Sequence, residues 1–202
     1  MSVVLPILLV VANVMGAGMI VPQVARLHRV RSVDGLSGIW VGVGVAMNNW
    51  WSAYGIAESL WGILPVSLTA SVLYVVMAIQ YLGIVGRVGL RPILVGAVTF
   101  GGFPLPFLAF GGWEVAGVAI GLCYAVQFMP AADTSLRSTD LTAISPMTWS
   151  MALTEAMIWV VYGLYTGDNA LLVGGTGGSL AAGVILVRLA WASTAGTHLL
   201  RR

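Results

Sequence analysis

The sequence predicts an all-α integral membrane protein, with seven transmembrane helices arranged as two parallel three-helix bundles joined by a linker helix (3+1+3). Three observations lead to this fold class. Hydrophobic residues make up 59% of the 202 residues, and charged residues only 8%. Apolar runs that approach the roughly 20 residues needed to cross a bilayer recur along the chain. A pattern that begins at Pro22 returns without a gap at Pro130, 108 positions later (130 − 22).

The composition excludes several classes of protein. With a mean hydropathy of +0.97, the chain has too few polar residues to cover its apolar surface in water, so we expect the lipid bilayer as its solvent. A net charge of +2 is too small to indicate nucleic-acid binding. The single cysteine, Cys123, excludes an internal disulfide and a multi-cysteine metal site. We therefore expect no metal and no cofactor.

The charges fix a predicted topology. Basic residues follow the first, third, fifth and seventh apolar segments, whereas the alternate loops carry only Glu58, Glu114 and Asp168. The positive-inside rule then places the N-terminus outside and the C-terminus in the cytoplasm, in the cell (plasma) membrane. The first segment lacks a basic start and is read as a retained span rather than a signal peptide. The expected segments are about 3–25, 36–57, 62–85, 91–111, 114–133, 143–165 and 168–191.

The repeat divides these segments. A shift of 108 positions places Trp51 on Trp159, and Tyr54-Gly55 on Tyr162-Gly163. We predict that residues 1–86 and 113–192 are two copies of one three-helix unit, and that 193–202 form a cytoplasmic tail. Residues 87–112, which include Gly101-Gly102, Pro104 and Pro106, resemble neither copy and are read as a linker helix. An odd span between the units makes both face the same way, as in parallel transporter repeats.

Pro22 and Pro130 are expected inside their helices, near the cytoplasmic ends. A proline removes one backbone hydrogen bond and kinks a helix. Because the two prolines are equivalent, we interpret them as hinges that let each bundle rock. A static kink is the alternative, since membrane helices tolerate proline.

The chain also repeats a tryptophan, at Trp51 and Trp159. A tryptophan near the end of a span is commonly an interface anchor. These two are equivalent in the two copies, and an indole face can contact sugar C–H groups or a cation. We therefore predict that both line a substrate pocket.

Two polar residues share the helical faces of these tryptophans. Glu155 lies four residues before Trp159, and Asn48 lies three residues before Trp51. A carboxyl inside an apolar span commonly faces a cavity and marks an ion or proton pathway. A structural carboxyl at Glu155, or a helix-to-helix hydrogen bond at Asn48, is the alternative. We include both residues in the predicted substrate site.

The stretch 22–37, PQxxxxxRxRSxDGLS, resembles the PQ-loop signature. Together with the repeated W-x-x-Y-G ending and the 3+1+3 layout, it makes the chain similar to the SWEET sugar transporters and to the half-sized SemiSWEETs. This resemblance implies that Trp51 and Trp159 stack on a sugar ring and that Pro22 and Pro130 are hinges.

The sequence departs from that family pattern in two places. The asparagines that follow Tyr-Gly by about a dozen residues in the family fall here near Ser67 and Gly175, which we include in the substrate site. Neither side chain offers the donor and the acceptor of an amide. The second copy has Ala131 in place of the glutamine, so its motif is weaker.

Tyr54 and Tyr162 lie one turn beyond the tryptophans, toward the acidic side, and are candidates for an outer gate. Tyrosines of an interface belt are the alternative. His28 and His198 fall outside the predicted spans, so an intramembrane Ser-His protease is not supported. We expect no catalytic residues and no enzyme activity.

Three functions follow from these patterns. The first is a transporter that moves a small polar solute, a sugar by the resemblance, by alternating access and facilitated diffusion. The second is a proton-coupled amino-acid transporter of the PQ-loop type, favoured by Glu155. The third is a non-transporting seven-helix receptor or scaffold like the KDEL receptor, favoured by the weaker second motif. The expected partners are a small-molecule solute, lipid and, as one option, further copies of the chain.

Overall fold

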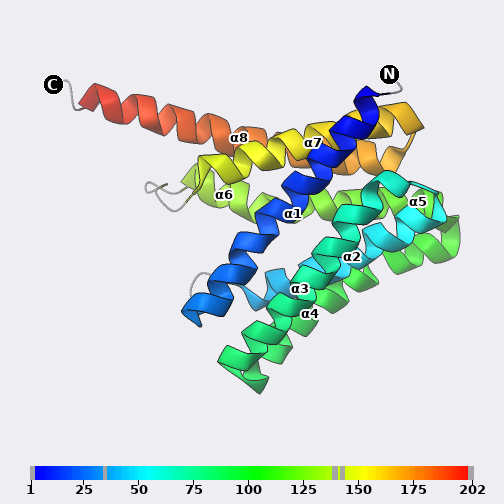
Figure 1. Cartoon of the computed structure of the whole chain (residues 1–202), viewed down its shortest axis with the longest axis horizontal. Coiled ribbons are helices and arrows are strands. Elements are labelled where there is room, and N and C mark those ends of the chain that lie inside the picture. The colour runs from blue at the N-terminus through cyan, green and yellow to red at the C-terminus, as the bar shows by residue number, and fades with distance from the viewer. Residues whose placement is uncertain (1–2, 34–35, 138–140, 142–143, 200–202) are drawn as a thin grey trace.

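The computed structural model describes residues 3–33, 36–137, 141 and 144–199, and these residues form helices and no strand (Figure 1). The all-α class is therefore confirmed. The elements are α1 (Val4–Val30), α2 (Gly38–Ala57), the 3₁₀ turn η1 (Trp61–Ile63), α3 (Leu64–Val85), the 3₁₀ turn η2 (Arg87–Gly89), α4 (Leu90–Gly102), α5 (Pro104–Val126), α6 (Met129–Arg137), α7 (Pro146–Thr166) and α8 (Asn169–Leu199).

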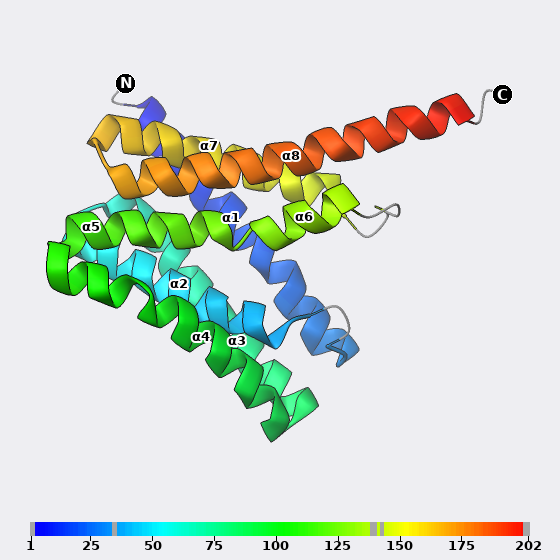
Figure 2. The ribbon, with the colours of Figure 1, turned by 180° about the vertical axis from the view of Figure 1, so that it is seen from behind.

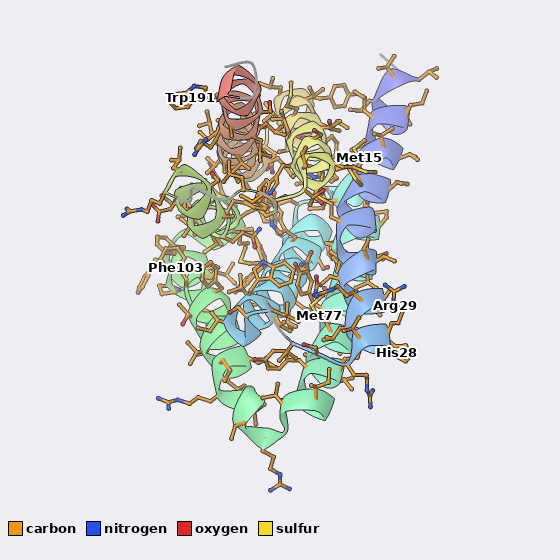
Figure 3. The ribbon with its side chains drawn as sticks, turned by 90° about the vertical axis from the view of Figure 1, so that its left-hand side faces the viewer. Met15, His28, Arg29, Met77, Phe103 and Trp191 are labelled. Atoms are coloured by element: carbon orange, nitrogen blue, oxygen red, sulfur yellow. The ribbon has the colours of Figure 1, made fainter. Side chains whose placement is uncertain are left out.

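Four stretches of the described chain are long and apolar enough to cross a membrane: Val4–Val30, Trp61–Val85, Arg87–Arg137 and Asn169–Ser193. The chain is thus compatible with an all-α membrane protein. Helices α2 and α7 have 20 and 21 residues but do not reach this hydropathy, because they carry polar residues such as Asn48 and Glu155. Large apolar side chains are exposed on the outside, among them Phe103, whereas Met77 lies between the helices (Figure 3).

Helix α5 reverses direction at Gly112, which has φ 65° and ψ −164° (Figure 2). A positive φ of this kind favours glycine, because a Cβ would clash with the backbone. The part of α5 before Gly112 continues the path of α4, and the part after it runs back beside α8 (Figure 2). The reversal coincides with the predicted boundary between the segments 91–111 and 114–133.

The helices pack as two groups of three. Helix α3 contacts both α1 and α2, and we call α1, α2 and α3 the first triple. Helix α8 contacts both α7 and α5, and we call α7, α8 and the part of α5 after Gly112 the second triple. The triples meet where α1 packs on α7 and where α2 packs on α5 (Figures 1 and 2).

Helix α4 packs on the outer side of α2 through two glycines. A Cβ at Gly42 would collide with the backbone oxygen of Ile93, and a Cβ at Gly96 with the backbone oxygen of Ile39. Small residues at such a crossing let two helix backbones approach closely, as is common in membranes. This contact attaches α4 to the first triple.

Local geometry is the same at several positions related by the 108-residue shift. Ser37 caps α2 by accepting a hydrogen bond from the Trp40 amide, and Ser145 caps α7 by accepting one from the Thr148 amide. The Leu60 amide donates to the Gly55 carbonyl at 2.8 Å. In the second triple, the Asp168 amide donates to the Gly163 carbonyl at 2.9 Å. The serine cap and the turn after Tyr-Gly are thus built alike in both triples.

The prolines differ from the prediction. Pro22 lies inside α1, as expected, and the helix continues past the predicted end to Val30. The predicted place of Pro130 inside one continuous helix over 114–133 is wrong, because α5 ends at Val126 and Pro130 is the second residue of the separate helix α6. The first turn of a helix accepts proline readily, since the missing N–H has no intrahelical partner there. The hinge role of both prolines stays a prediction.

Candidate functional site

A cavity of about 70 Å³ lies where the two triples meet. This volume holds on the order of five water molecules. Its walls come from α2, α3 and η1 on one side and from α5, α7 and α8 on the other. The lining residues are Asn48, Trp51, Ile63, Val66, Ser67, Tyr124, Glu155, Trp159, Leu171, Gly174 and Gly175.

Eight of these residues form four pairs, and each pair is related by the 108-residue shift. The pairs are Trp51 with Trp159, Ile63 with Leu171, Val66 with Gly174, and Ser67 with Gly175. Equivalent positions of the two triples therefore face one another across one cavity. Each triple thus contributes an indole and a large aliphatic side chain, together with Val66 and Ser67 in the first triple and Gly174 and Gly175 in the second.

The three remaining residues break this equivalence. Asn48, Tyr124 and Glu155 line the cavity, whereas their equivalents at 156, 16 and 47 are alanine, glycine and methionine. These three carry an amide, a phenol and a carboxyl. The cavity thus has a paired, mostly apolar frame and an unpaired polar set.

Glu155 is the charged residue of this set. Its side chain is 5% exposed, and its Oε1 accepts a hydrogen bond from Trp159 Nε1 at 3.1 Å, one helical turn away. Helix α1 approaches it closely, because a Cβ at Gly16 would stand 2.5 Å from Oε1. Within the described residues, no arginine or histidine forms an ion pair with it.

The two tryptophans differ in their hydrogen bonds. Trp159 donates its indole N–H to Glu155, whereas the indole N–H of Trp51 is buried and has no partner among the described residues. The ring of Trp51 makes edge contacts with Tyr54 at 6.0 Å and with Tyr124 at 6.1 Å between ring centroids. Trp51, which lines the cavity, therefore keeps a buried donor without a partner in the described chain.

Asn48 and Ser67 belong to one hydrogen-bonded group on the first triple. The Ser52 hydroxyl lies 2.8 Å from the backbone carbonyl oxygen of Asn48 and 3.0 Å from Ser67 Oγ. The Asn48 amide nitrogen donates to Gly44 O at 2.8 Å, within its own helix. The Asn48 side-chain oxygen accepts no hydrogen bond from the described residues, so it is available to a solute.

The two predicted gate tyrosines have different surroundings. Tyr54 is buried, and its hydroxyl donates to Asp168 Oδ2 at 2.6 Å, which joins α2 to the turn between α7 and α8. The other Asp168 oxygen, Oδ1, accepts from the Leu171 amide at 2.8 Å at the start of α8. Tyr162 is also buried, beside Gly62. Of the two tyrosines, Tyr54 is the one whose hydroxyl makes a hydrogen bond between the triples in the described part of the chain.

All six predicted substrate-site residues line the one cavity: Asn48, Trp51, Ser67, Glu155, Trp159 and Gly175. Tyr54 and Tyr162 lie one turn beyond the tryptophans, and each packs its ring on its own tryptophan. The sequence analysis missed Tyr124. The repeat gives no signal for it, because its equivalent is Gly16. It also missed Asp168 as the partner of Tyr54.

Within the described residues, no group of three His, Cys, Asp or Glu side chains could hold a metal ion. No model of a known protein family matches the chain, and no curated protein matches it.

Proposed function

We propose that the protein is a membrane transporter that moves a small polar solute between its two triples by alternating access. One observation carries the proposal: the cavity at the junction of the triples is framed by four pairs of equivalent residues, with Trp51 facing the cavity from one triple and Trp159 from the other. A site shared by two similar units is the arrangement that repeat transporters use, because each unit can rock against the other around a bound solute.

The proposal includes seven membrane spans in a 3+1+3 order. The packing supports this order, since α3 and α8 occupy matching places between the other two helices of their triples. The fourth span would consist of α4 and the part of α5 before Gly112. The proposed orientation, with the N-terminus outside, rests on charge. Basic and acidic residues lie at opposite ends of the helices, with Arg29, Arg87 and Arg137 at one end and Glu58 and Asp168 at the other.

In this proposal the described conformation is closed on the acidic, outer side. The Tyr54–Asp168 hydrogen bond ties α2 to the second triple, and opening that side requires its loss. Pro22 and the break before Pro130 are the candidate hinges for the motion.

A sugar is the first candidate solute, by the resemblance to SWEET proteins and because two indole faces suit the C–H surface of a sugar ring. A proton-coupled amino-acid transporter is the second candidate. It is favoured by the buried carboxyl of Glu155 in the cavity wall. A receptor that binds without transport would use the same cavity and differ only in lacking exchange.

The test is solute exchange in proteoliposomes that contain the purified protein. Labelled sugars and amino acids are offered against an excess of the same unlabelled solute inside, with and without a proton gradient. We expect one solute to exchange, and Trp51→Ala or Trp159→Ala to abolish that exchange. Trp61→Ala is the matched control, because Trp61 is exposed and does not line the cavity.

Binding without any exchange would favour the receptor. Accumulation driven by the proton gradient would favour the amino-acid transporter over facilitated diffusion. Equal losses in the Trp61 and Trp159 variants would contradict the role of the cavity.

A further inference from the structure

Among the residues that the structure describes, the carboxyl of Glu155 has no charged partner. It faces Gly16 of α1 and Val66 of α3, and Trp159 stands one turn beyond it on α7. Trp51 of α2 and Tyr124 of α5 line the same cavity. None of these residues is basic. A charged carboxylate in such a place is costly unless a cation joins it.

The cavity offers several groups that suit a cation. Trp51, Trp159 and Tyr124 line it with three aromatic rings, and the faces of such rings attract ammonium groups. The side-chain oxygen of Asn48 is a further acceptor without a partner in the described chain. A neutral solute fits the protonated carboxyl, whereas an ammonium group supplies the counter-charge and the hydrogen bonds that the ionised carboxylate needs.

The cavity wall also contains one hydrogen-bond donor without a partner in the described chain. The indole N–H of Trp51 is buried and unpartnered, and an unmade buried hydrogen bond is costly. It lies on the first triple, opposite the triple that carries Glu155. A solute oxygen can accept from it while an amine contacts Glu155. The first triple therefore offers a hydrogen-bond donor to one end of a solute, and the second triple offers a carboxylate to the other end.

We propose that the cavity binds a small amine that also carries an acceptor oxygen, with its ammonium group on Glu155 and its oxygen on the indole N–H of Trp51. This assignment rests on the proposed transport function for its physiological meaning and names the class of solute. Small amino acids, amino alcohols and amino sugars have both groups. The paired tryptophans alone would accept a neutral sugar equally well, so the carboxylate is what selects the amine.

The experiment compares solutes that differ only in an ammonium group replaced by a hydroxyl. The pairs are ethanolamine with ethylene glycol, L-alanine with L-lactate, and D-glucosamine with D-glucose. Binding to the purified full chain is measured by the rise in its unfolding temperature, because a ligand stabilises the folded state that it binds. Exchange of the same solutes is measured separately in proteoliposomes.

We expect the amine of at least one pair to stabilise the protein more than its hydroxyl partner. Glu155→Gln should weaken binding of that amine by about tenfold to a hundredfold, the range for a lost hydrogen bond to a charged group. It should leave the weak binding of the hydroxyl partner unchanged. Glu114→Gln is the matched control, because this exposed carboxyl does not line the cavity. Trp51→Phe keeps a ring but removes the N–H, and should weaken binding by about fivefold or more.

The two proposals fail in different ways. Exchange of D-glucose with no preference for D-glucosamine would overturn the amine assignment and leave transport standing. Binding of an amine that depends on Glu155 but never exchanges would overturn transport and leave the assignment standing. No stabilisation by any of the amines, or an equal effect of Glu155→Gln on both members of a pair, would overturn the assignment.

Discussion

The Trp51 and Trp159 sides of the cavity occupy equivalent positions in the two triples but make different hydrogen bonds. Trp159 is tied to Glu155 and is nearly fully buried, whereas Trp51 keeps an unpartnered N–H and contacts Tyr124 by its ring edge. Equivalent positions frame both tryptophans, with Ile63 matching Leu171, although Val66 and Ser67 are replaced by Gly174 and Gly175 in the second triple. The difference teaches that duplication supplies the shape of the cavity, while single substitutions in one copy supply its charge.

The largest test of this comparison removes one tryptophan at a time. Trp159→Ala deletes the partner of Glu155 along with a buried ring, and loss of a buried aromatic side chain alone costs about 3–5 kcal/mol. We expect Trp51→Ala to cost less, by about 1.5–3 kcal/mol, because no hydrogen bond to a charged group is lost there. The measurement is the unfolding temperature in detergent. Adding Glu155→Gln to Trp159→Ala should recover part of the loss, and equal losses at both tryptophans would contradict the asymmetry.

A second test moves the carboxyl without removing it. Gly16→Ala places a methyl group against both Glu155 Oε1 and Val66 Cγ2, so α1 or one of these two side chains must shift. Overpacking of this kind costs about 1–3 kcal/mol. The control is Gly83→Ala, where a methyl group would meet nothing within 4 Å. We expect a lower unfolding temperature for Gly16→Ala alone. An unchanged temperature would show that Glu155 is not held at this contact.

A third test compares the two tyrosines. Tyr54→Phe removes the hydrogen bond to Asp168, whose net value is about 1.5–3 kcal/mol for a charged acceptor. Because this bond joins the triples on one side, its loss should favour opening there. Tyr162→Phe should change little. Accessibility of a cysteine introduced at Ser67 to a polar thiol reagent, in a chain with Cys123→Ala, measures the opening. Equal accessibility in the two tyrosine variants would contradict a gate at Tyr54.

The smallest expected effect is at Ser67. Ser67→Ala removes its contact with the Ser52 hydroxyl, and hydrogen bonds between membrane helices average about 0.6 kcal/mol. The equivalent position is already a glycine, so the second triple shows that the frame forms without this hydroxyl. We expect a fall in unfolding temperature close to the error of the measurement. A large fall would mean that the serine pair is a structural contact of the first triple.

The cavity could be predicted from sequence because the repeat marks it. One shift of 108 positions, together with the family resemblance, identifies two pairs, Trp51 with Trp159 and Ser67 with Gly175. All four residues line the cavity. Tyr124 could not be found this way, because the first copy has a glycine in its place. The Tyr54–Asp168 bond was also out of reach, since it joins residues 114 positions apart that are not equivalent.

The helix ends were predicted less well than the helices. The α5 reversal at Gly112 lies between the predicted segments 91–111 and 114–133, beside the acidic residue Glu114. The separate helix α6 was not expected, because an apolar run through Pro130 can be read either as a kinked helix or as two helices. Hydropathy alone also misses α2 and α7. Asn48 and Glu155, which line the cavity, are among the polar residues that lower the hydropathy of these two helices.

The glycine crossing of α2 and α4 has a mechanical consequence. Since Gly42 and Gly96 bring the two backbones into direct contact, the helices have no side-chain layer that could slide. In a rocking cycle, α4 must therefore travel with α2. In the proposed cycle the two moving bodies would be unequal, with four helices in one and three in the other. In that proposed cycle, the exposed apolar side chains of α4, among them Leu94 and Val98, would move with the first triple.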